Sequence, residues 1–574
     1  MPEAPILDPL SSLTPELQSE LQKHTDSVLL GIIKANANTQ YGRTSPALVN
    51  FRQAVNVTTT GDDNYPDTFR ETVPLSTYDD YRSYCFRFFE SPCKASEVTD
   101  LLSPGMPQSL AVSSATSSNR YKYFPRGPQP RAVFPTGEVT SWVWYLGNFR
   151  VIDVEGENGQ CVGKVPVCSG TASFVRNCFE LGQEVEASHM SNTPQGQVAP
   201  LAAGLISQYR SFLLIHGLFS LANRDIEVFS IAFMSTIADM LRYIEDEYIV
   251  LADAIEKGII PEYEGIGHVQ SYLKTALRPN PERAAELRAL GVPSKISGWA
   301  GRAWPKLKLV AGIASGPFAH AVPKIKSYLG PTCAVVTTVY ASSECMIGFK
   351  YNSMNLNQYK LTREEIIEFL DVTADENATN LTSAWEVEAG KRYEIVLTTR
   401  DGLWRYRIND VVEIVGFAPS DGSPIFQYVE RRSGGIRFSH TVTSEECLKE
   451  AILSVQDALG QVLEFTVAFD ERDLPATFGY FVEIAGELGP SPEAAPQQVI
   501  NKLLDLNPDY QSLLDNGKLR KPTIRVVKSG TFLEMRRSKT DKGSGTSIGQ
   551  IKTPVVLSDG AMKEWIEKHV MQEF

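Results

Sequence analysis

The sequence has no apolar run long enough to cross a bilayer. Its most apolar stretch, Ser211–Ala222, is about a dozen residues long, whereas a membrane helix needs roughly 20 residues. The N-terminal segment Met1–Leu10 contains proline and acids and lacks the basic and then apolar order of a signal peptide. We therefore expect a cytoplasmic protein that binds no membrane.

Basic side chains are outnumbered by acidic ones. The chain has 55 Lys and Arg against 68 Asp and Glu, a formal net charge of −13. Such an excess of negative charge argues against a general affinity for nucleic acid. The eight cysteines form no CxxC pair and no zinc-finger spacing, so we expect reduced thiols and not disulfides or metal ligands.

A P-loop motif is missing, and the glycine-rich turn after the predicted strand Leu307–Val310 lacks the nucleophile-elbow pattern. No Gly-x4-Gly-Lys-Ser/Thr pattern occurs, which disfavours a P-loop kinase or GTPase. Ser315 is the fourth residue of Gly312-x-x-Ser315-Gly316, so the chain has no GxSxG nucleophile elbow there. The turn around Ser315 therefore does not indicate serine hydrolase chemistry.

The length of 574 residues exceeds what one hydrophobic core usually supports, so at least two domains are expected. Apolar spacing predicts a helix over Thr14–Asn36, with Thr14 as its N-cap. It also predicts two long amphipathic helices between Leu201 and Ile259. One face of these helices, including His216, is either core or the lining of an apolar substrate cavity.

The middle of the chain changes from an α/β to a β pattern. A strand over Leu307–Val310, a helix over Ala319–Leu329 and an apolar run over Cys333–Val339 follow βαβ order. The stretch Arg392–Phe417 predicts a β-hairpin, or part of a β-barrel-like subdomain of the large domain, with a turn at Asp401-Gly402. The fold class is therefore mixed α/β.

The stretch Ala418–Pro424 is rich in Pro, Gly and Ser and reads as a linker. We place a domain boundary just after it, with a large domain over 1–426 and a small, mobile α+β domain over 427–574. Strands in the small domain are predicted over Leu463–Phe469, Phe478–Ile484 and Thr523–Val527, and helices over Ala494–Leu504 and Gly560–Met571.

Four stretches carry site-like chemistry. Thr338, Tyr340, Ser342 and Glu344 follow a buried strand, where a nucleotide and its metal could bind. A hydroxyl-rich loop after Leu110–Val112 holds Lys122 and can offer donors to phosphate oxygens; alone it could also be an ordinary loop. Asp410 could bind a ribose diol or simply form a turn, and Lys552 lies in a glycine-rich stretch typical of a solvated loop.

Taken in order, these stretches resemble the auxin-responsive Gretchen Hagen family of acyl-acid amido synthetases, within the firefly-luciferase-like acyl-adenylate superfamily. The resemblance covers nearly the whole chain, as that of a divergent member. It rests on the motifs Ser113-Ser114-Ala115-Thr116-Ser117, Pro279-Asn-Pro281, Tyr340-Ala-Ser-Ser-Glu344, Tyr406-Arg407-x-x-Asp410, Phe426-x-Tyr428-Val429 and Gln550-x-Lys552-Thr-Pro554.

The resemblance implies a two-step reaction. A carboxylic acid is activated as acyl-AMP with release of pyrophosphate, and the acyl group then passes to an amino acid or amine with release of AMP. ATP and Mg²⁺ are the implied cofactors, and we expect a monomer. The implied roles are phosphate binding by Ser113, Ser114, Thr116 and Ser117, adenine stacking by Tyr340 beside Thr338 and Ser342, Mg²⁺ binding by Glu344, ribose binding by Asp410, and catalysis by Lys552 together with Glu344.

The sequence departs from the family pattern at three places. Ala115 and Asn409 replace usual glycines, and Gly434-Gly435 loosens the region after the linker. Asn409 is a mild change because Asn tolerates left-handed backbone conformations. None of the three removes a charged catalytic group, so we expect an active enzyme. The alternatives are an acyl-CoA ligase with a thiol acceptor and a catalytically silent nucleotide-binding protein.

Overall fold

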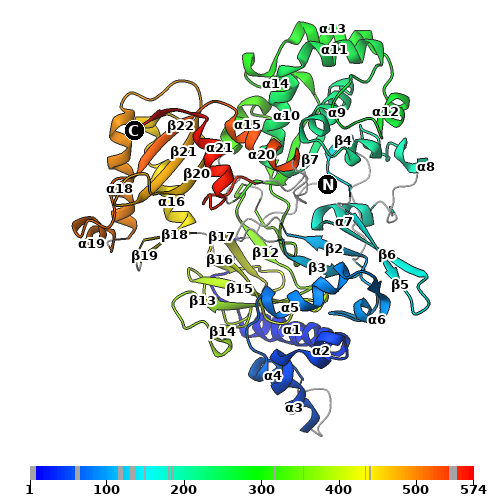
Figure 1. The fold of residues 1–574 in the computed structure, drawn as a ribbon, viewed down its shortest axis with the longest axis vertical. Helices are drawn as coiled ribbons and strands as arrows, with labels where there is room; N and C mark the ends of the chain where they lie inside the picture. The colour runs from blue at the N-terminus through cyan, green and yellow to red at the C-terminus, as the bar shows by residue number, and fades with distance from the viewer. Residues whose placement is uncertain are drawn as a thin grey trace.

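The chain folds into several sheets flanked by helices (Figure 1). The computed structural model describes residues 8–574 except 58–64, 114–120, 129–137, 148–149, 179–180, 182–186, 316–318, 320, 353, 433–434, 439–440, 508 and 542–551. In this part of the chain, no helix is both long and apolar enough to cross a membrane. The mixed α/β class that the sequence predicts is confirmed.

A parallel four-stranded sheet lies under the helices at the top of Figure 1. Its strands, in spatial order, are β4 (Thr140–Val143), β7 (Val228–Phe233), β8 (Leu309–Ile313) and β9 (Ala334–Val336). The main helices around it are α9 (Tyr209–Ala222), α10 (Met234–Asp246), α11 (Tyr248–Lys257), α13 (Pro281–Leu290) and α15 (Ala321–Leu329). The βαβ order β8–α15–β9 agrees with the pattern seen in the sequence.

The prediction of two long helices between Leu201 and Ile259 is wrong. The segment contains α9, α10 and α11, and the strand β7 separates the first two. Ile226, Phe229 and Phe233 recur at nearly helical spacing, but Phe229 and Phe233 belong to β7. A central parallel strand is buried on both faces, so its apolar residues do not alternate with polar ones. Such a continuous apolar run can be mistaken for the apolar face of a helix.

The second sheet of the large part of the chain is antiparallel and has eight strands. Its strands, in spatial order, are β10 (Val339–Ala341), β11 (Met346–Lys350), β12 (Tyr359–Leu361), β17 (Pro424–Arg431), β16 (Tyr406–Phe417), β15 (Arg392–Thr398), β13 (Ile366–Asp371) and β14 (Leu381–Thr382). The predicted hairpin is confirmed as β15 and β16. Its turn needs Gly402, whose φ is 95° and where a Cβ would lie 2.0 Å from the carbonyl oxygen of Leu102.

The predicted linker is the turn between β16 and β17. Strand β17 pairs with β16 from Pro424 as far as Arg431. The boundary that we place between residues 426 and 427 therefore lies inside this strand of the large sheet.

A five-stranded sheet and the N-terminal helix complete the large part of the chain. Its strands, in spatial order, are β1 (Cys93–Lys94), β5 (Arg150–Glu155), β6 (Cys161–Ser169), β2 (Ser109–Val112) and β3 (Tyr123–Arg126). Helix α1 (Pro15–Asn36) begins as predicted, because the Thr14 side chain accepts a hydrogen bond from the backbone N–H of Leu17 at 3.3 Å.

The C-terminal part has its own sheet and its own apolar core. The strands are β20 (Val462–Asp470), β21 (Thr477–Ile484), β22 (Thr523–Val527) and β23 (Val570–Glu573), and the main helices are α16 (Glu445–Leu453), α18 (Ala495–Leu506), α20 (Thr531–Asp541) and α21 (Gly560–Glu567). A short hairpin, β18 (Gly435–Phe438) and β19 (Thr441–Ser444), precedes α16. The predicted terminal helix ends early, since the last residues pair with β22 as β23.

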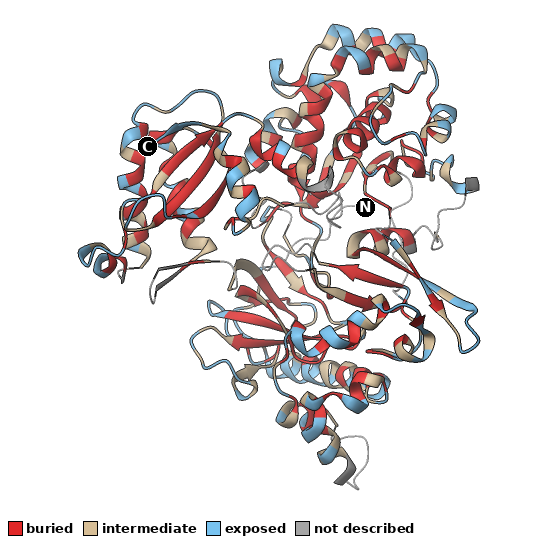
Figure 2. Cartoon of the chain, in the orientation of Figure 1, coloured by how far each residue is buried: buried red, intermediate tan, exposed pale blue. Residues whose placement is uncertain are grey.

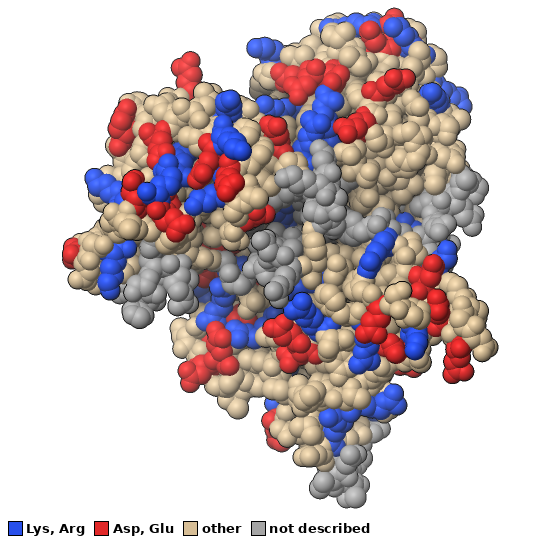
Figure 3. Space-filling model, viewed as in Figure 1, with Lys and Arg blue, Asp and Glu red and all other residues tan. Residues whose placement is uncertain are grey.

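Burial and charge follow this layered arrangement. Figure 2 shows buried residues along the strands of the sheets and along α9 and α10. On the face drawn in Figure 3, acidic and basic side chains are interspersed, so the net charge of −13 is not gathered into one field on that face. The seven cysteines assigned within the described residues are free thiols, which agrees with the expected reduced state.

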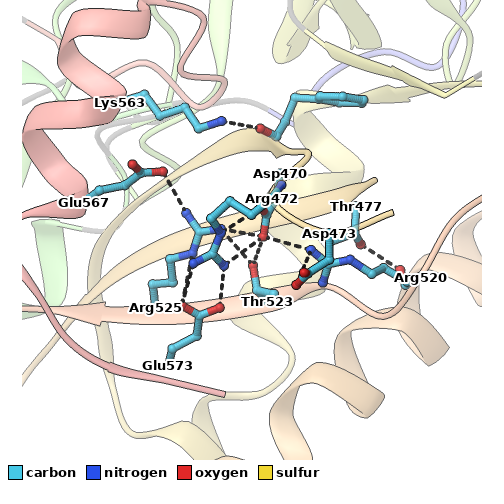
Figure 4. A network of polar contacts seen from close by, with 11 residues as sticks. Asp470, Arg472, Asp473, Thr477, Arg520, Thr523, Arg525, Lys563, Glu567 and Glu573 are labelled. Atoms are coloured by element: carbon cyan, nitrogen blue, oxygen red, sulfur yellow. Dashed lines mark hydrogen bonds and ion pairs between the residues drawn. The ribbon is translucent and has the colours of Figure 1, made fainter. Parts of the chain in front are cut away.

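One buried carboxylate connects several basic side chains at the C-terminal sheet (Figure 4). Asp470, at the end of β20, has no exposed side-chain surface and accepts hydrogen bonds from Arg472, Thr523 and Arg525. The guanidinium of Arg520 lies 3.3 Å from the same carboxylate. Burial alone would raise the pKa of Asp470, but the bonds from Arg472 and Thr523 and the charge of Arg525 hold it well below its usual value.

The substitution Asp470→Asn should destabilise the protein by about 3 kcal/mol, because it removes the nearest counter-charge of the buried Arg525 guanidinium, whose other carboxylates, Glu567 and Glu573, lie farther away. Chemical unfolding monitored by fluorescence measures this loss. Asp473→Asn is the matched control, since Asp473 is 82% exposed and lies 3.9 Å from Arg520, and it should change stability by less than about 0.5 kcal/mol. Equal effects of the two substitutions would contradict this account of the network.

Candidate active site

The stretch from Cys333 to Glu344 passes from one sheet to another. The apolar run Cys333–Val339, expected as one strand, divides into β9 of the parallel sheet and β10 of the antiparallel sheet. Strand β10 then forms a hairpin with β11. The turn between them is held by Ser342, whose Oγ accepts hydrogen bonds from the backbone N–H groups of Glu344 at 3.2 Å and Cys345 at 3.4 Å. Ser342 thus shapes the turn that carries Glu344.

Tyr340 lies at the centre of an aromatic group. Its ring centroid is 5.4 Å from that of Tyr359, 5.6 Å from Phe426 and 5.9 Å from Tyr428. Its hydroxyl donates a 2.5 Å hydrogen bond to Oδ2 of Asp410. Burial and the nearby charge of Asp410 both raise the pKa of Tyr340, so the phenol stays protonated as a donor.

Asp410 is held between two strands. The preceding residue, Asn409, has a φ of 62°, which confirms that Asn supplies the left-handed backbone usually left to glycine. Across the β16–β17 ladder, Nε of Arg431 donates to Oδ1 of Asp410 at 2.6 Å. Each carboxylate oxygen keeps a further lone pair, so Asp410 can still accept bonds from a ligand's hydroxyls.

Glu344 is fixed through its backbone and keeps its carboxylate available. Its carbonyl oxygen accepts a hydrogen bond from Arg126, whose Nε lies 3.1 Å from Oδ2 of Asp401. Oδ1 of Asp401 also accepts from the backbone N–H of Gly127 at 2.8 Å. Glu344 as a whole is only 8% exposed, and among the residues that the structure describes no donor bonds its carboxylate. A single carboxylate completed by substrate phosphates is a typical Mg²⁺ donor set, so the residues present fit this cation.

Lys122 supplies positive charge beside Glu344. Ser113 and Lys122 close their loop with two hydrogen bonds, from the Ser113 N–H to the Lys122 carbonyl at 2.9 Å and from the Lys122 N–H to the Ser113 Oγ at 3.2 Å. The Lys122 ammonium lies 3.3 Å from the hydroxyl of Tyr406. Burial lowers the pKa of Lys122, and the charge of Glu344 opposes that shift.

Lys552 reaches this region from the C-terminal part of the chain. Its Nζ lies 5.5 Å from the ring centroid of Phe233, at the end of β7. Burial and the charge of Arg431 lower the pKa of Lys552 to about 8, against the opposing charges of Asp410 and Glu445. A lysine that is remote in sequence thus lies in the same electrostatic environment as Asp410.

The structure brings most of the describable predicted site residues together. Tyr340, Glu344, Asp410 and Lys552 are linked through Lys122 and Arg431, which interact with them electrostatically. Thr338 is exposed, and its carbonyl accepts a hydrogen bond from the N–H of Lys350 at 2.9 Å. The predictions for Ser114, Thr116 and Ser117, and the question of Ala115, lie outside the described residues.

Sequence reasoning missed Arg431 and did not place Arg126. Arg431 lies two residues after the motif Phe426-x-Tyr428-Val429, but no spacing rule marks it as the partner of Asp410. His216 is buried in α9 with a ring 4.6 Å from that of Phe212, and burial lowers its pKa to about 3. Its predicted place in a substrate cavity stays a prediction.

Comparisons with known proteins cover the whole length of the chain. The GH3 family N-terminal, central and C-terminal domains match residues 14–334, 360–431 and 446–561. Indole-3-acetic acid-amido synthetase GH3.8 of Oryza sativa subsp. indica is 25% identical, over 97% of this chain and 91% of its own. Jasmonoyl--L-amino acid synthetase JAR6 of Nicotiana attenuata is 24% identical over 85% of each chain. The solved structure of the GH3.15 acyl acid amido synthetase has a TM-score of 0.76, with 23% identity over 99% of this chain and 98% of that one.

Proposed function

The chain belongs to the GH3 family, and on that premise we propose that it is an ATP-dependent amide-bond synthetase. It activates a carboxylic acid as acyl-AMP with release of pyrophosphate, and it then transfers the acyl group to an amino acid or amine with release of AMP. Relatives named for indole-3-acetic acid and for jasmonic acid conjugation support the reaction class and leave the acid open.

One observation carries this proposal: Asp410 is paired with Arg431 at 2.6 Å and bonded to Tyr340 at 2.5 Å, and the charges of this pair act on Lys552 as that of Glu344 acts on Lys122. Adenylation must bring a carboxylate against a phosphate, two anions that repel each other. A cluster of cations with one uncommitted carboxylate meets that need, because it neutralises the anions and can hold a metal.

The roles follow from the positions of the groups. Arg431 and the Tyr340 hydroxyl orient Asp410, which would accept hydrogen bonds from the ribose hydroxyls. The Tyr340 ring would lie against adenine, beside Thr338. Glu344 would hold Mg²⁺ together with the phosphates, and the cation would neutralise charge on the departing pyrophosphate. Lys552 would hold its proton and bridge the reacting carboxylate and the α-phosphate.

We propose that the large unit, taken as 1–426, binds both substrates and that the small unit, 427–574, turns over the site between the two steps. Strand β17 stays paired with β16 as far as Arg431, so the turning point would follow that residue. The separate apolar core of the C-terminal sheet supports movement as a unit.

A pyrophosphate-exchange screen tests the proposal. Purified protein is incubated with ATP, Mg²⁺ and single carboxylic acids, and the best acid is then offered a panel of amino acids and amines with mass-spectrometric detection. We expect acid-dependent exchange and an amide product. A thioester formed with CoA in the absence of amine would identify an acyl-CoA ligase instead, and nucleotide binding without turnover would identify a silent protein.

Glu344→Gln should slow the acid-dependent exchange by about 2–4 kcal/mol in activation free energy, the usual loss when one electrostatic group is removed from a reacting centre. Exchange rates at saturating ATP and acid measure the effect. Glu364→Gln is the control, because Glu364 is 66% exposed and pairs with Arg400 at the surface. Near-normal exchange by Glu344→Gln would contradict the proposal that Glu344 binds Mg²⁺.

The pH dependence of adenylation should report Lys552. Its pKa of about 8 is below the ordinary value for lysine, so the ammonium is present at pH 7 and is lost as the pH rises through 8. The kcat/KM for exchange should therefore fall above pH 8, and the midpoint of the fall should report the pKa of Lys552 in the substrate-free enzyme. Lys552→Arg keeps its charge across this range and should abolish that fall, even if its rate is lower; an unchanged pH profile would contradict the role of Lys552.

A further inference from the structure

Helix α20 of the C-terminal part packs directly on the large unit. Figure 1 draws it between the C-terminal sheet and helices α9 and α10. Leu533 of this helix is 8% exposed and belongs to the apolar core that is formed chiefly by α9, α10 and α11. The contact is therefore a buried surface between units and not an incidental touch.

A buried, two-pronged ion pair crosses this surface. Nε and Nη2 of Arg536, in α20, donate to the two carboxylate oxygens of Asp239, in α10, at 2.8 Å each. The hydroxyl of Tyr209 donates a third bond to Asp239 at 2.7 Å. The side chains of Arg536 and Asp239 are 5% and 6% exposed, so both charges depend on their protein partners in place of water.

The other side of the same guanidinium leads to the segment that carries Lys552. Nη1 of Arg536 donates to Glu464, in β20, and lies 3.2 Å from the hydroxyl of Thr553. Thr553 itself donates to Glu464 at 2.5 Å. Thr553 directly follows Lys552, and the carbonyl of Pro554 accepts a hydrogen bond from Thr466 at 2.7 Å. A continuous set of polar contacts thus joins α10 to the peptide next to Lys552.

We propose that Arg536 is a positioning residue for the adenylation step. Its bond to Asp239 latches the C-terminal unit in the orientation that brings Lys552 to the nucleotide site, and the latch opens when the unit turns for acyl transfer to the amine. This inference rests on the proposed function and adds to it the contact that selects between the two steps.

The energetics suit a reversible latch. When both partners of a buried ion pair return to water together, the lost attraction is largely offset by regained solvation, so the pair can open at small net cost. Removing Arg536 leaves Asp239 buried without a counter-charge, and removing the charge of Asp239 leaves Arg536 with Glu464 as its carboxylate partner. Either change removes the attraction across the surface and disfavours the closed orientation. A change at Asp239 should therefore shift the population of orientations. Arg536 also bonds Glu464 and Thr553 inside the C-terminal unit, so Asp239 is the cleaner site for the test.

A second contact across the same surface is weaker and more exposed. Nη2 of Arg242 donates to the carbonyl of Ser529 at 3.3 Å, and its Nη1 lies 3.9 Å from Glu483. Gly530 allows this approach, because a Cβ there would lie 2.6 Å from the Arg242 guanidinium. The Arg242 side chain is 37% exposed, so we assign the latch to Arg536 and Asp239.

The test is Asp239→Asn, which keeps the shape of the side chain and removes its charge. Two rates are measured separately: acid-dependent pyrophosphate exchange, and amide formation from chemically prepared acyl-adenylate and amine. We expect exchange to fall by at least about tenfold, as the closed orientation is depopulated, and transfer from the acyl-adenylate to keep its wild-type rate. Arg536→Lys, which retains the charge without the two-pronged geometry, should recover part of the exchange lost in Arg536→Gln.

Glu368→Gln is the matched control for loss of a buried pair. Glu368 binds Arg405 with two hydrogen bonds of 2.9 and 2.8 Å, wholly inside the large unit. It should lower thermal stability and affect the two rates alike. Small-angle X-ray scattering gives a second readout, in which Asp239→Asn should expand relative to the wild type while Glu368→Gln should not.

The outcomes separate the two levels of inference. An active wild type with an equally active Asp239→Asn, or equal losses in both half-reactions, overturns the latch and leaves the proposed function intact. A wild type that is inert towards every acid overturns the proposed function itself.

Discussion

The ion pair between Asp410 and Arg431 is the contact on which the site depends. It joins β16 to β17 at the last paired residue of the large antiparallel sheet. Through Asp410 it reaches the hydroxyl of Tyr340, in β10, and through the charge of Arg431 it influences Lys122 and Lys552. Because the aspartate is 6% exposed, its charge requires this partner, and the partner in turn fixes the orientation of the carboxylate.

Around this pair, the site brings buried cationic and anionic side chains close together, where water screens their charges poorly. Lys122, Arg431 and Lys552 supply cations, and Glu344, Asp410 and Glu445 supply anions. Burial raises the pKa of Glu445 to about 7 and lowers that of Lys552 to about 8, so both groups change their charge within one unit or so of neutral pH. Such tuning is expected where a reaction must hold anions together without binding them permanently.

The groups of the site come from two units of the chain. The turn that carries Glu344 is held on the large unit by Ser342 and by the Asp401–Arg126 pair. Lys552 belongs to a unit with a separate core, and its neighbours Thr553 and Pro554 are anchored on β20. In the proposed reaction, Glu344 would thus stay fixed while Lys552 is carried in by the C-terminal unit.

What the sequence by itself determined was local. The helix capped by Thr14, the hairpin that turns at Asp401-Gly402 and the left-handed residue Asn409 follow from short patterns, because their causes lie within a few residues. The motifs around Tyr340, Asp410 and Lys552 identified the family for the same reason. Tertiary structure alone decided that Phe229 lies in a strand, since burial on both faces removes the alternation that marks one. It also split Cys333–Val339 between two sheets and paired Asp239 with Arg536, residues 297 apart, because such contacts depend on how distant elements pack and leave no periodic signal in the chain.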